Sequence, residues 1–341
     1  MRKPKSRYVF VGNWDSILFQ QRLERILDLL GLPEHTILDT RRHNVKDIVR
    51  FLFASACVMI KIFVSTKRTY LVLHGAYSPV LWPLLLLNRV RTISILQESE
   101  LNIDFVGIRT HLITLILQRS FLIVCRNEAQ RDRVQRLCNI RRERCVIAHW
   151  GLKQELFDYP LTVRPPEPVL ISPRATQFWY NIPVIFEAIS RLKREGYRFH
   201  FVYVRFNPKF ALAETHVADL ILDAPTQEKL WDAIAAADLC ISVPDYDGLS
   251  NTLMETLALG AMPVYSDIAA NTFLKQDSRL GIEVNFSKSG CDKTDQLYLA
   301  LKCALKDIEK IRSNAGFRRA FAAKHFKVSS NIDKIIDALN D

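Results

Sequence analysis

Two acidic side chains eight residues apart, Asp247 and Glu255, stand where a short apolar run gives way to a helical pattern. The run ends at Pro244, an acidic turn that contains a glycine follows, and we expect an apolar helix over 251–259 with Gly260 as its C-terminal cap. The N-terminus of such a helix offers free backbone N–H groups and the positive end of its dipole to an anion. Both carboxylates are also acceptors for sugar hydroxyls. On these grounds alone, an N-capping Asp247 and a solvated Glu255 explain the residues equally well.

The elements that would position these residues follow an alternating pattern. Short apolar runs, most of them rich in β-branched or aromatic residues, alternate with amphipathic segments, which is typical of α/β proteins with buried parallel strands and right-handed crossovers. Helices are expected at segments such as 20–30, 129–137, 182–195 and 226–237. The expected strands are 8–11, 36–38, 70–73, 92–96, 121–125, 145–148, 169–172, 199–204, 220–222, 239–243, 262–265 and 282–284.

The chain is expected to divide near residue 160. Residues 158–168 hold four prolines in eleven positions, which indicates a linker. Residues 1–160 carry 25 Lys and Arg against 14 Asp and Glu, whereas residues 161–341 carry 22 of each, so the whole net charge of +11 lies before this point. We therefore predict two domains, 1–160 and 161–341, with the last helix available to pack back on the first.

Composition narrows the function classes. The 341 residues are 49% hydrophobic and 24% charged, which excludes disordered and fibrous classes. No run has the roughly 18–20 uncharged apolar residues of a spanning helix, and the basic N-terminus lacks the apolar region of a signal peptide. Seven cysteines without a C-x-x-C pair favour a reduced, cytoplasmic protein. The positive first half indicates an anionic partner (nucleic acid, an anionic membrane surface or a phosphorylated substrate), or simply a soluble protein of high isoelectric point.

Four segments, in order, resemble a known family. Residues 247–255 and the stretch 256–267 look like the E-x7-E signature of retaining GT-B glycosyltransferases of the "glycosyl transferases group 1" type, with Asp in place of the first Glu. The other three resemble the signature that closes the N-terminal domain of the family, the opening of its C-terminal domain, and the helix and strand before the acidic motif. They are 147–157, 172–188 and 226–239.

This resemblance implies a GT-B architecture, in which two Rossmann-like parallel-sheet domains face each other across a cleft. The C-terminal domain would hold a nucleotide-sugar donor and the N-terminal domain the acceptor. Carried over to this sequence, Glu255 would accept hydrogen bonds from the ribose, Asp247 would bind the transferred sugar, and Arg174 would pair with the pyrophosphate, unless it is simply a surface arginine. The backbone of four residues would line the sugar and phosphates: Gly248, Leu249, Ser250 and Asn251.

The sequence departs from the family pattern after Arg174. Family members usually have a lysine about six residues later, but here residues 178–181 are Phe-Trp-Tyr-Asn. Either Arg174 and the helix N-terminus suffice, or a basic residue comes from elsewhere in the fold. Asn181 could instead simply cap the following helix, which carries Pro183 in its first turn.

The first domain gives weaker signals. The histidine that many relatives carry after a middle strand is absent, so Glu98 and Glu100 are the nearest catalytic candidates, with a solvated loop as the alternative. His74 follows an earlier strand and either faces the cleft or is structural. The loop after the first strand, where the family contacts its acceptor, contains Gly12, Asn13 and Trp14 but lacks the usual double glycine.

The family reaction needs neither a metal nor another cofactor. The resemblance implies a front-face displacement in which the leaving phosphate oxygen helps to deprotonate the acceptor hydroxyl, while the protein positions both substrates and stabilises charge. No His/Cys cluster has zinc spacing, and Asp245 and Asp247 are better explained by the acidic motif than by a metal-binding D-x-D.

Basic and apolar segments of the first half suit an anionic lipid surface. Residues 41–68 combine a helix-like apolar run, 51–60, with basic flanks, and 80–87 and 131–144 add further apolar and basic stretches. This favours a peripheral protein on the inner face of the cytoplasmic membrane that acts on a lipid-linked saccharide. The alternative is that these runs are helices buried against the first sheet.

The leading hypothesis is a retaining hexosyltransferase that transfers a sugar to a saccharide or lipid-linked saccharide in surface polysaccharide, lipopolysaccharide or glycolipid biosynthesis. An inverting transferase or a nucleotide-sugar epimerase is the first alternative. A basic nucleic-acid-binding protein is a second, although no recognition module is evident and no nucleic acid is expected as a partner. A glycosyltransferase-like fold without activity is the third, because the lysine and the histidine are missing.

Overall fold

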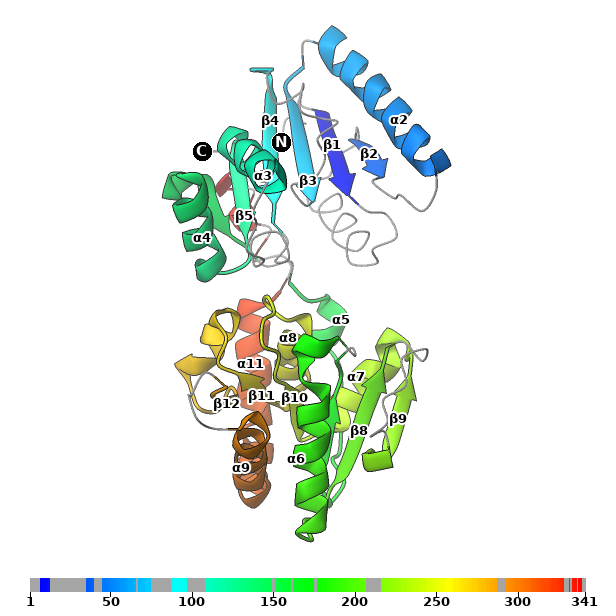
Figure 1. Cartoon of the computed structure of the whole chain (residues 1–341), viewed down its shortest axis with the longest axis vertical. Coiled ribbons are helices and arrows are strands. Elements are labelled where there is room, and N and C mark those ends of the chain that lie inside the picture. Colours follow the sequence, from blue (N-terminus) through cyan, green and yellow to red (C-terminus); the bar gives the residue numbers. More distant parts are fainter. Residues whose placement is uncertain are drawn as a thin grey trace. The chain divides into compact units, whose positions relative to one another are not determined.

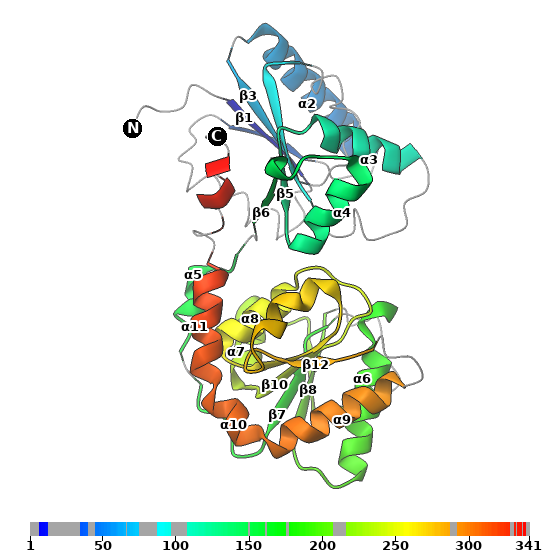
Figure 2. The same ribbon diagram turned by 90° about the vertical axis from the view of Figure 1, so that its left-hand side faces the viewer.

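The computed structural model describes most of the chain, in two compact units, Met1–Gly151 with Val328–Asp341 and Leu152–Lys327. Each unit contains a six-stranded parallel sheet (Figures 1 and 2). The described residues are 7–12, 35–39, 45–65, 67–74, 87–96, 108–148, 151–160, 162–174, 177–206, 216–286, 292–327, 331, 333–335 and 337–338.

The first unit has the strand order β2-β1-β3-β4-β5-β6. Its helices α2 (Val45–Val64), α3 (Ile108–Arg119) and α4 (Glu128–Cys138) cover one face of the sheet (Figure 2). The strands are β1 (Arg7–Gly12), β2 (His35–Asp39), β3 (Thr69–His74), β4 (Val90–Ile95), β5 (Leu122–Cys125) and β6 (Cys145–Ile147).

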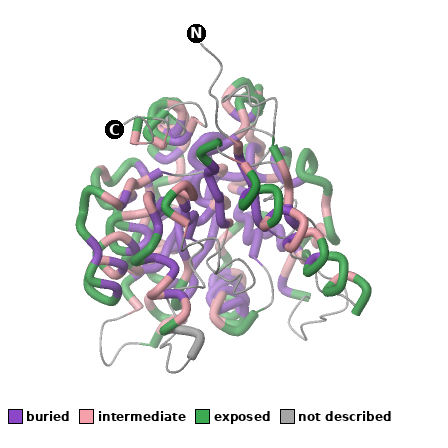
Figure 3. The backbone as a smooth tube through the Cα atoms, turned by 90° about the horizontal axis from the view of Figure 1, so that it is seen from above, coloured by how far each residue is buried: buried purple, intermediate pink, exposed green. Residues whose placement is uncertain are grey.

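Alternate side chains of these strands point to opposite faces of the sheet. Val9 and Leu71 pack under the three helices, whereas Tyr70 lies in the cluster on the other face. Ile335 and Ala338, from the end of the chain, pack against that second cluster. Strands β1 and β3 are therefore buried on both faces of the sheet, which explains why they are almost continuously apolar (Figure 3).

The second unit has the order β12-β11-β10-β7-β8-β9. Its strands are β7 (Val169–Ser172), β8 (His200–Arg205), β9 (Leu220–Asp223), β10 (Leu239–Ser242), β11 (Met262–Ser266) and β12 (Ile282–Val284). Its helices are α5 (Gln154–Phe157), α6 (Ile182–Arg194), α7 (Gln227–Ala236), α8 (Asn251–Leu259), α9 (Lys293–Lys306), α10 (Ile308–Ser313) and α11 (Ala315–His325). Helices α6 and α9 pack on one face of the sheet and α7, α8 and α11 on the other.

Each expected strand is present, and its ends differ from the prediction by at most two residues. The helices expected at 129–137, 182–195, 226–237 and 251–259 are present as well, as α4, α6, α7 and α8. The helix expected at 20–30 lies outside the described residues. The predictions succeed because strands covered on both faces leave a short, uninterrupted apolar run in the sequence.

The boundary between the units lies at 151/152, nine residues before the expected division. Residues 152–160 belong to the second unit because Leu156 is buried in its core, and Arg319 of α11 donates to the Tyr159 carbonyl at 2.5 Å. The proline-rich segment is likewise fixed to this unit rather than acting as a free linker. Arg312 donates to the Pro165 carbonyl at 2.8 Å and forms an ion pair with the fully buried Asp238 at 2.9 Å.

Helix α8 ends at Gly260, as expected, with a left-handed φ of 84°. A β-carbon at this position would lie 3.3 Å from the β-carbon of Ala315, at the start of α11. Gly260 therefore has two tasks, because it ends α8 in a conformation that side chains disfavour and it lets α11 approach closely.

We expect Gly260→Ala to destabilise the protein more than Gly196→Ala. Gly196 has nearly the same φ, 83°, but a β-carbon added there would meet no atom within 4 Å, so this variant measures the backbone strain alone, about 1–2 kcal/mol. Urea unfolding followed by circular dichroism compares the two variants. Equal losses of unfolding free energy in the two variants would show that α11 moves away from the added β-carbon without a further cost.

Candidate functional site

The strand order of the second sheet brings two loops together. From β7 the chain proceeds to β8 and β9 on one side, and then returns to β10 on the other side of β7. In open parallel sheets, ligands bind beyond the carboxyl ends of the strands at such a switch point. The loop after β7 carries Arg174, and the loop after β10 carries Asp247 and Ser250.

The Arg174 guanidinium connects these two loops. Its Nε donates to Ser242 Oγ at 2.6 Å and its Nη2 to Ser250 Oγ at 2.5 Å, while Nη2 lies 2.8 Å from Asp247 Oδ2. The Tyr180 ring lies 5.0 Å from the guanidinium carbon. Arg174 is only 8% exposed, so it is a fixed part of the site and not a surface arginine.

The N-terminus of α8 lies beside this ion pair. Ser250 is the N-cap, and its hydroxyl accepts from the Leu253 N–H at 3.4 Å. Asp247 instead accepts from the N–H of its neighbour Gly248 at 2.9 Å, so the alternative of an N-capping Asp247 is wrong. Gly248, Leu249 and Asn251 complete the same turn. The positive end of the helix dipole and the guanidinium together favour an anion here.

Glu255 lies in the second turn of α8, beside α7. The Gln227 side-chain amide donates to its Oε1 at 3.5 Å. Burial raises the pKa of Glu255 to about 7, and the nearby Trp231 indole acts in the opposite direction. Glu255 is thus partly buried rather than fully solvated, and α7 supplies an environment that eight-residue spacing alone does not reveal.

We expect this shift to make the stability of the protein depend on pH. The pKa of Glu255 is higher in the folded state than in the unfolded chain, so its contribution is fully present below pH 4.5 and is lost as the pH rises through about 7. As the pH rises past about 7, Glu255 should cost the wild type at most about 3 kcal/mol of unfolding free energy, and Glu255→Gln should not show this loss. Urea unfolding of both proteins at pH 5 and pH 8 tests this. An unchanged difference between them at the two pH values would contradict it.

A second set of contacts holds the two loops against each other. The Asp245 N–H donates to the Trp179 carbonyl at 2.8 Å, and the Asn181 amide donates to Val243 O and Asp245 Oδ1, both at 2.9 Å. The Asn181 side chain does not cap α6, contrary to one interpretation of the sequence. Lys293, at the start of α9, forms an ion pair with Asp245 and is thus a basic residue that reaches the site from a distant segment.

The residues expected in the first unit are only partly described. Gly12 and His74 end the neighbouring strands β1 and β3, at the point where the order β2-β1-β3 reverses direction. This is the switch point of the first sheet. The other four, Asn13, Trp14, Glu98 and Glu100, lie outside the described residues.

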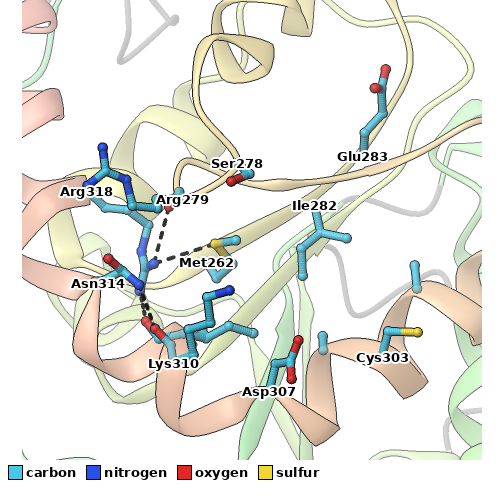
Figure 4. A pocket seen from close by; sticks show the side chains of 13 residues that line it. Met262, Ser278, Arg279, Ile282, Glu283, Cys303, Asp307, Lys310, Asn314 and Arg318 are labelled. Atoms are coloured by element: carbon cyan, nitrogen blue, oxygen red, sulfur yellow. Dashed lines mark hydrogen bonds between the residues drawn. The ribbon is translucent and has the colours of Figure 1, made fainter.

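A cavity of about 340 Å³ opens at the amino ends of β11 and β12, away from the switch point (Figure 4). The buried Arg318 borders it, but its guanidinium donates to the carbonyls of Gly260 at 2.9 Å and Ile311 at 2.7 Å. Burial lowers the pKa of Arg318 to about 9. This arginine is thus engaged in joining α10 and α11 to the end of α8. Within the described ranges, no group of three or more His, Cys, Asp or Glu residues could hold a metal ion.

The sequence expectations did not name the contacts that Ser242, Tyr180, Gln227 and Lys293 make in the site. Ser242 gave a usable signal, because it is a polar residue in an otherwise apolar strand end. Tyr180 and Gln227 gave none. They reach Arg174 and Glu255 only because η4 (Phe178–Tyr180) and α7 pack beside these residues.

No protein-family model and no curated protein sequence matches the chain. Solved structures match its fold along its whole length. The sucrose-phosphate synthase of Thermosynechococcus elongatus has a TM-score of 0.75 at 11% identity and covers 98% of this chain and 99% of its own. A glycosyltransferase from Rickettsia africae has a TM-score of 0.72 at 13% identity, with 100% of both chains covered. The HepE protein of Anabaena, in complex with UDP, has a TM-score of 0.71 at 10% identity and covers 98% and 99%.

The fold is GT-B. It consists of two α/β domains, each with a parallel sheet, as the sequence predicted. At this identity the likeness concerns the fold alone. The chemistry of the site is therefore inferred from the switch-point geometry of the second GT-B domain.

Proposed function

We propose that this protein is a retaining glycosyltransferase of the E-x7-E type that transfers a sugar from a nucleotide-sugar donor. The observation that carries the proposal is the Arg174–Asp247 pair at the N-terminus of α8, at the switch point of the second sheet. A cation and a helix N-terminus suit a pyrophosphate, and the flanking carboxylates suit the hydroxyls of two sugars.

Each residue has a distinct task in this proposal. Arg174 pairs with the pyrophosphate, and the backbone of residues 248–251 contacts the phosphates and the sugar. Asp247 binds the transferred sugar, and Glu255 accepts hydrogen bonds from the ribose. The solved complexes support this donor class, because HepE of Anabaena has been determined with UDP and with UDP-glucose.

The chemistry follows from positioning and charge. In a front-face displacement, the acceptor oxygen attacks the anomeric carbon from the side on which the phosphate leaves, and a phosphate oxygen takes up the hydroxyl proton. The protein stabilises the charge that develops on the leaving pyrophosphate, which Arg174 and the α8 dipole are placed to do. The proposal includes no metal or other cofactor.

Acceptor binding is assigned to the first unit. The candidates for acceptor contact are Gly12, which ends β1, and the following Asn13 and Trp14; the catalytic candidates on this side are His74, Glu98 and Glu100. The acceptor is a saccharide. In support, TarM of S. aureus, a solved protein of similar fold, has been determined with fondaparinux and α-GlcNAc-glycerol beside UDP.

We expect one of UDP, GDP, ADP or dTDP to stabilise the wild type by about 2.7 kcal/mol at a hundredfold excess over its Kd. Glu255→Ala should weaken this binding about tenfold, because the ribose hydroxyls lose an acceptor. Thermal shift and calorimetry measure both effects. Glu187→Ala, which removes an exposed carboxylate of α6, is the matched control and should bind like the wild type.

Absence of binding to all four nucleotides at millimolar concentration would overturn the donor site. The configuration of the product separates the mechanisms, because a retaining enzyme preserves the anomeric configuration of the donor. An inverted product, observed by NMR, would instead indicate an inverting transferase of the same fold.

Helix α2 has an unusual exposed face. Phe51, Val58 and Ile62 are buried toward the sheet, yet Phe53 is 72% and Val64 80% exposed. Other exposed apolar residues at helical spacing join them on the solvent side: Val45, Ile48, Val49, Leu52, Ile60 and Phe63. Lys46, Arg50 and Lys61 are exposed on the same helix.

This combination supports a peripheral location on an anionic leaflet, at the cytoplasmic face of the membrane, with a lipid-linked saccharide as acceptor. Apolar side chains would enter the interface while the basic ones meet the headgroups. None of the described helices has both the length and the apolar character needed to cross a bilayer. In this proposal the enzyme acts in the synthesis of a surface polysaccharide, such as a lipopolysaccharide, or of a glycolipid.

We expect the protein to sediment with vesicles containing anionic lipid and to bind neutral phosphatidylcholine vesicles weakly. Val49→Ser with Phe53→Ser should lower the anionic binding about tenfold or more, because two apolar contacts are lost. Leu299→Ser, which changes an exposed residue of α9, should have no effect. Equal binding by both variants would show that α2 is not the contact surface.

A further inference from the structure

An aromatic cluster lies next to the Arg174–Asp247 pair, and the tasks proposed above do not use it. Its members are Phe178, Trp179 and Tyr246. The rings of Trp179 and Tyr246 stack with centroids 5.3 Å apart at 29°, and Phe178 meets Trp179 edge-on at 5.0 Å. Phe178 is 79% and Tyr246 45% exposed. Large aromatic side chains exposed together in one place commonly mark a binding surface.

The cluster is held rigidly although it faces solvent. The hydrogen bond from the Asp245 N–H to Trp179 O, at 2.8 Å, joins the two loops that carry the stacked rings. Asn181 bonds both Val243 and Asp245, and Lys293 pairs with Asp245. Three segments distant in sequence therefore fix Trp179 against Tyr246. A preorganised surface loses little conformational entropy when a ligand binds.

We propose that Trp179 and Tyr246 form a stacking platform for a sugar ring. This inference rests on the proposed glycosyltransferase function and assigns to the same site a recognition element that the acidic motif does not contain. A pyranose ring has an apolar face of C–H groups, which packs on aromatic rings, and an edge of hydroxyls, which needs acceptors. Here the two neighbours of Tyr246 in the chain, Asp245 and Asp247, both carry carboxylates.

The position of the platform favours a sugar over a nucleobase. Glu255, proposed to bind the ribose, lies in the second turn of α8, about 6 Å along the helix axis from Asn251. Tyr246 precedes the helix and stacks on the loop after β7. The proposed phosphate contacts at residues 248–251 separate the two. A nucleoside at Glu255 therefore places the other end of the donor, and the acceptor that it meets, near Trp179.

The platform also accounts for the sequence between Arg174 and α6. Phe178, Trp179 and Tyr180 form the short helix η4, whose Tyr180 ring contacts the Arg174 guanidinium at 5.0 Å. This one turn thus places the Tyr180 ring against Arg174, which is proposed to bind the pyrophosphate, and places the Phe178 and Trp179 rings on the solvent side. Where related sequences are expected to carry a lysine, this chain uses aromatic surface.

The test uses Trp179 itself as the reporter. The chain has five tryptophans, so protein labelled with 5-fluorotryptophan gives five fluorine resonances, and the one absent from Trp179→Phe belongs to Trp179. The probes are methyl glycosides of glucose, galactose, mannose and N-acetylglucosamine, and the four nucleoside diphosphates with their glucose conjugates. We expect the Trp179 resonance to shift with at least one sugar-bearing probe.

Affinities of variants separate the two sources of the sugar ring. Trp179→Ala and Tyr246→Ala should each weaken the sugar-bearing probe about five- to tenfold, and Trp179→Phe should restore most of the loss. Loss confined to the nucleotide sugar identifies the transferred sugar as the ring on the platform, and loss confined to the methyl glycosides identifies the acceptor. Binding of the free nucleoside diphosphate should change less than twofold in both variants.

Three results would overturn the platform. The first is equal weakening of free-nucleotide binding, which would indicate base stacking or a purely structural role. The second is unchanged sugar affinity in both alanine variants. The third is the absence of a shift of the Trp179 resonance with any probe. Leu299→Ala, a truncation of similar exposure on α9, controls for general effects. If no nucleotide binds the wild type while glycosides still shift Trp179, the proposed donor site fails and the platform stands.

Discussion

The ion pair of Arg174 and Asp247 is the contact on which the organisation of the second unit's site depends. Arg174 follows β7 and Asp247 follows β10, two strands that are neighbours in the sheet and far apart in the chain. Because the pair is largely withdrawn from water, removal of either partner would leave a charge with poor solvation. Ser242, at the end of β10, and Ser250, the N-cap of α8, both accept hydrogen bonds from the guanidinium, so Arg174 links the strand end to the start of the helix.

This arrangement distributes charge in a way that suits a diphosphate with a sugar at each end. The guanidinium and the α8 N-terminus form a positive centre, and carboxylates lie on either side of it. Asp247 holds the arginine in the free protein, so an incoming phosphate would share that guanidinium with the carboxylate or replace it. Burial raises the pKa of the partly buried Glu255 to about 7, and the Trp231 indole of α7 acts in the opposite direction.

The two units have different surfaces. The net charge of the chain lies in the first 160 residues, and α2 exposes apolar and basic side chains from the same helix. Residues 161–341 are balanced in charge, and the exposed Phe178 and Tyr246 lie beside the switch point of the second unit. The proposed contact of the first unit with a lipid surface and the proposed binding of a nucleotide sugar by the second unit are therefore tested separately.

Much of the fold could be predicted from the sequence, because parallel strands buried on both faces are continuous apolar runs between amphipathic helices. The same local rules placed α8 and its Gly260 cap, since helix ends depend on residues a few positions apart. The acidic motif, with Asp247 and Glu255, and Arg174 were likewise visible as residue types following strands. Tertiary structure decided what those residues contact: Ser242 and Ser250 lie 68 and 76 positions from Arg174, and Lys293 lies 48 from Asp245. It also placed the unit boundary at 151/152, directed the Asn181 side chain to Val243 and Asp245 instead of to the start of α6, and placed the partly buried Glu255 beside α7. These outcomes depend on which elements the strand order of the sheet brings together, and the pattern of neighbouring residues in the sequence does not determine that order.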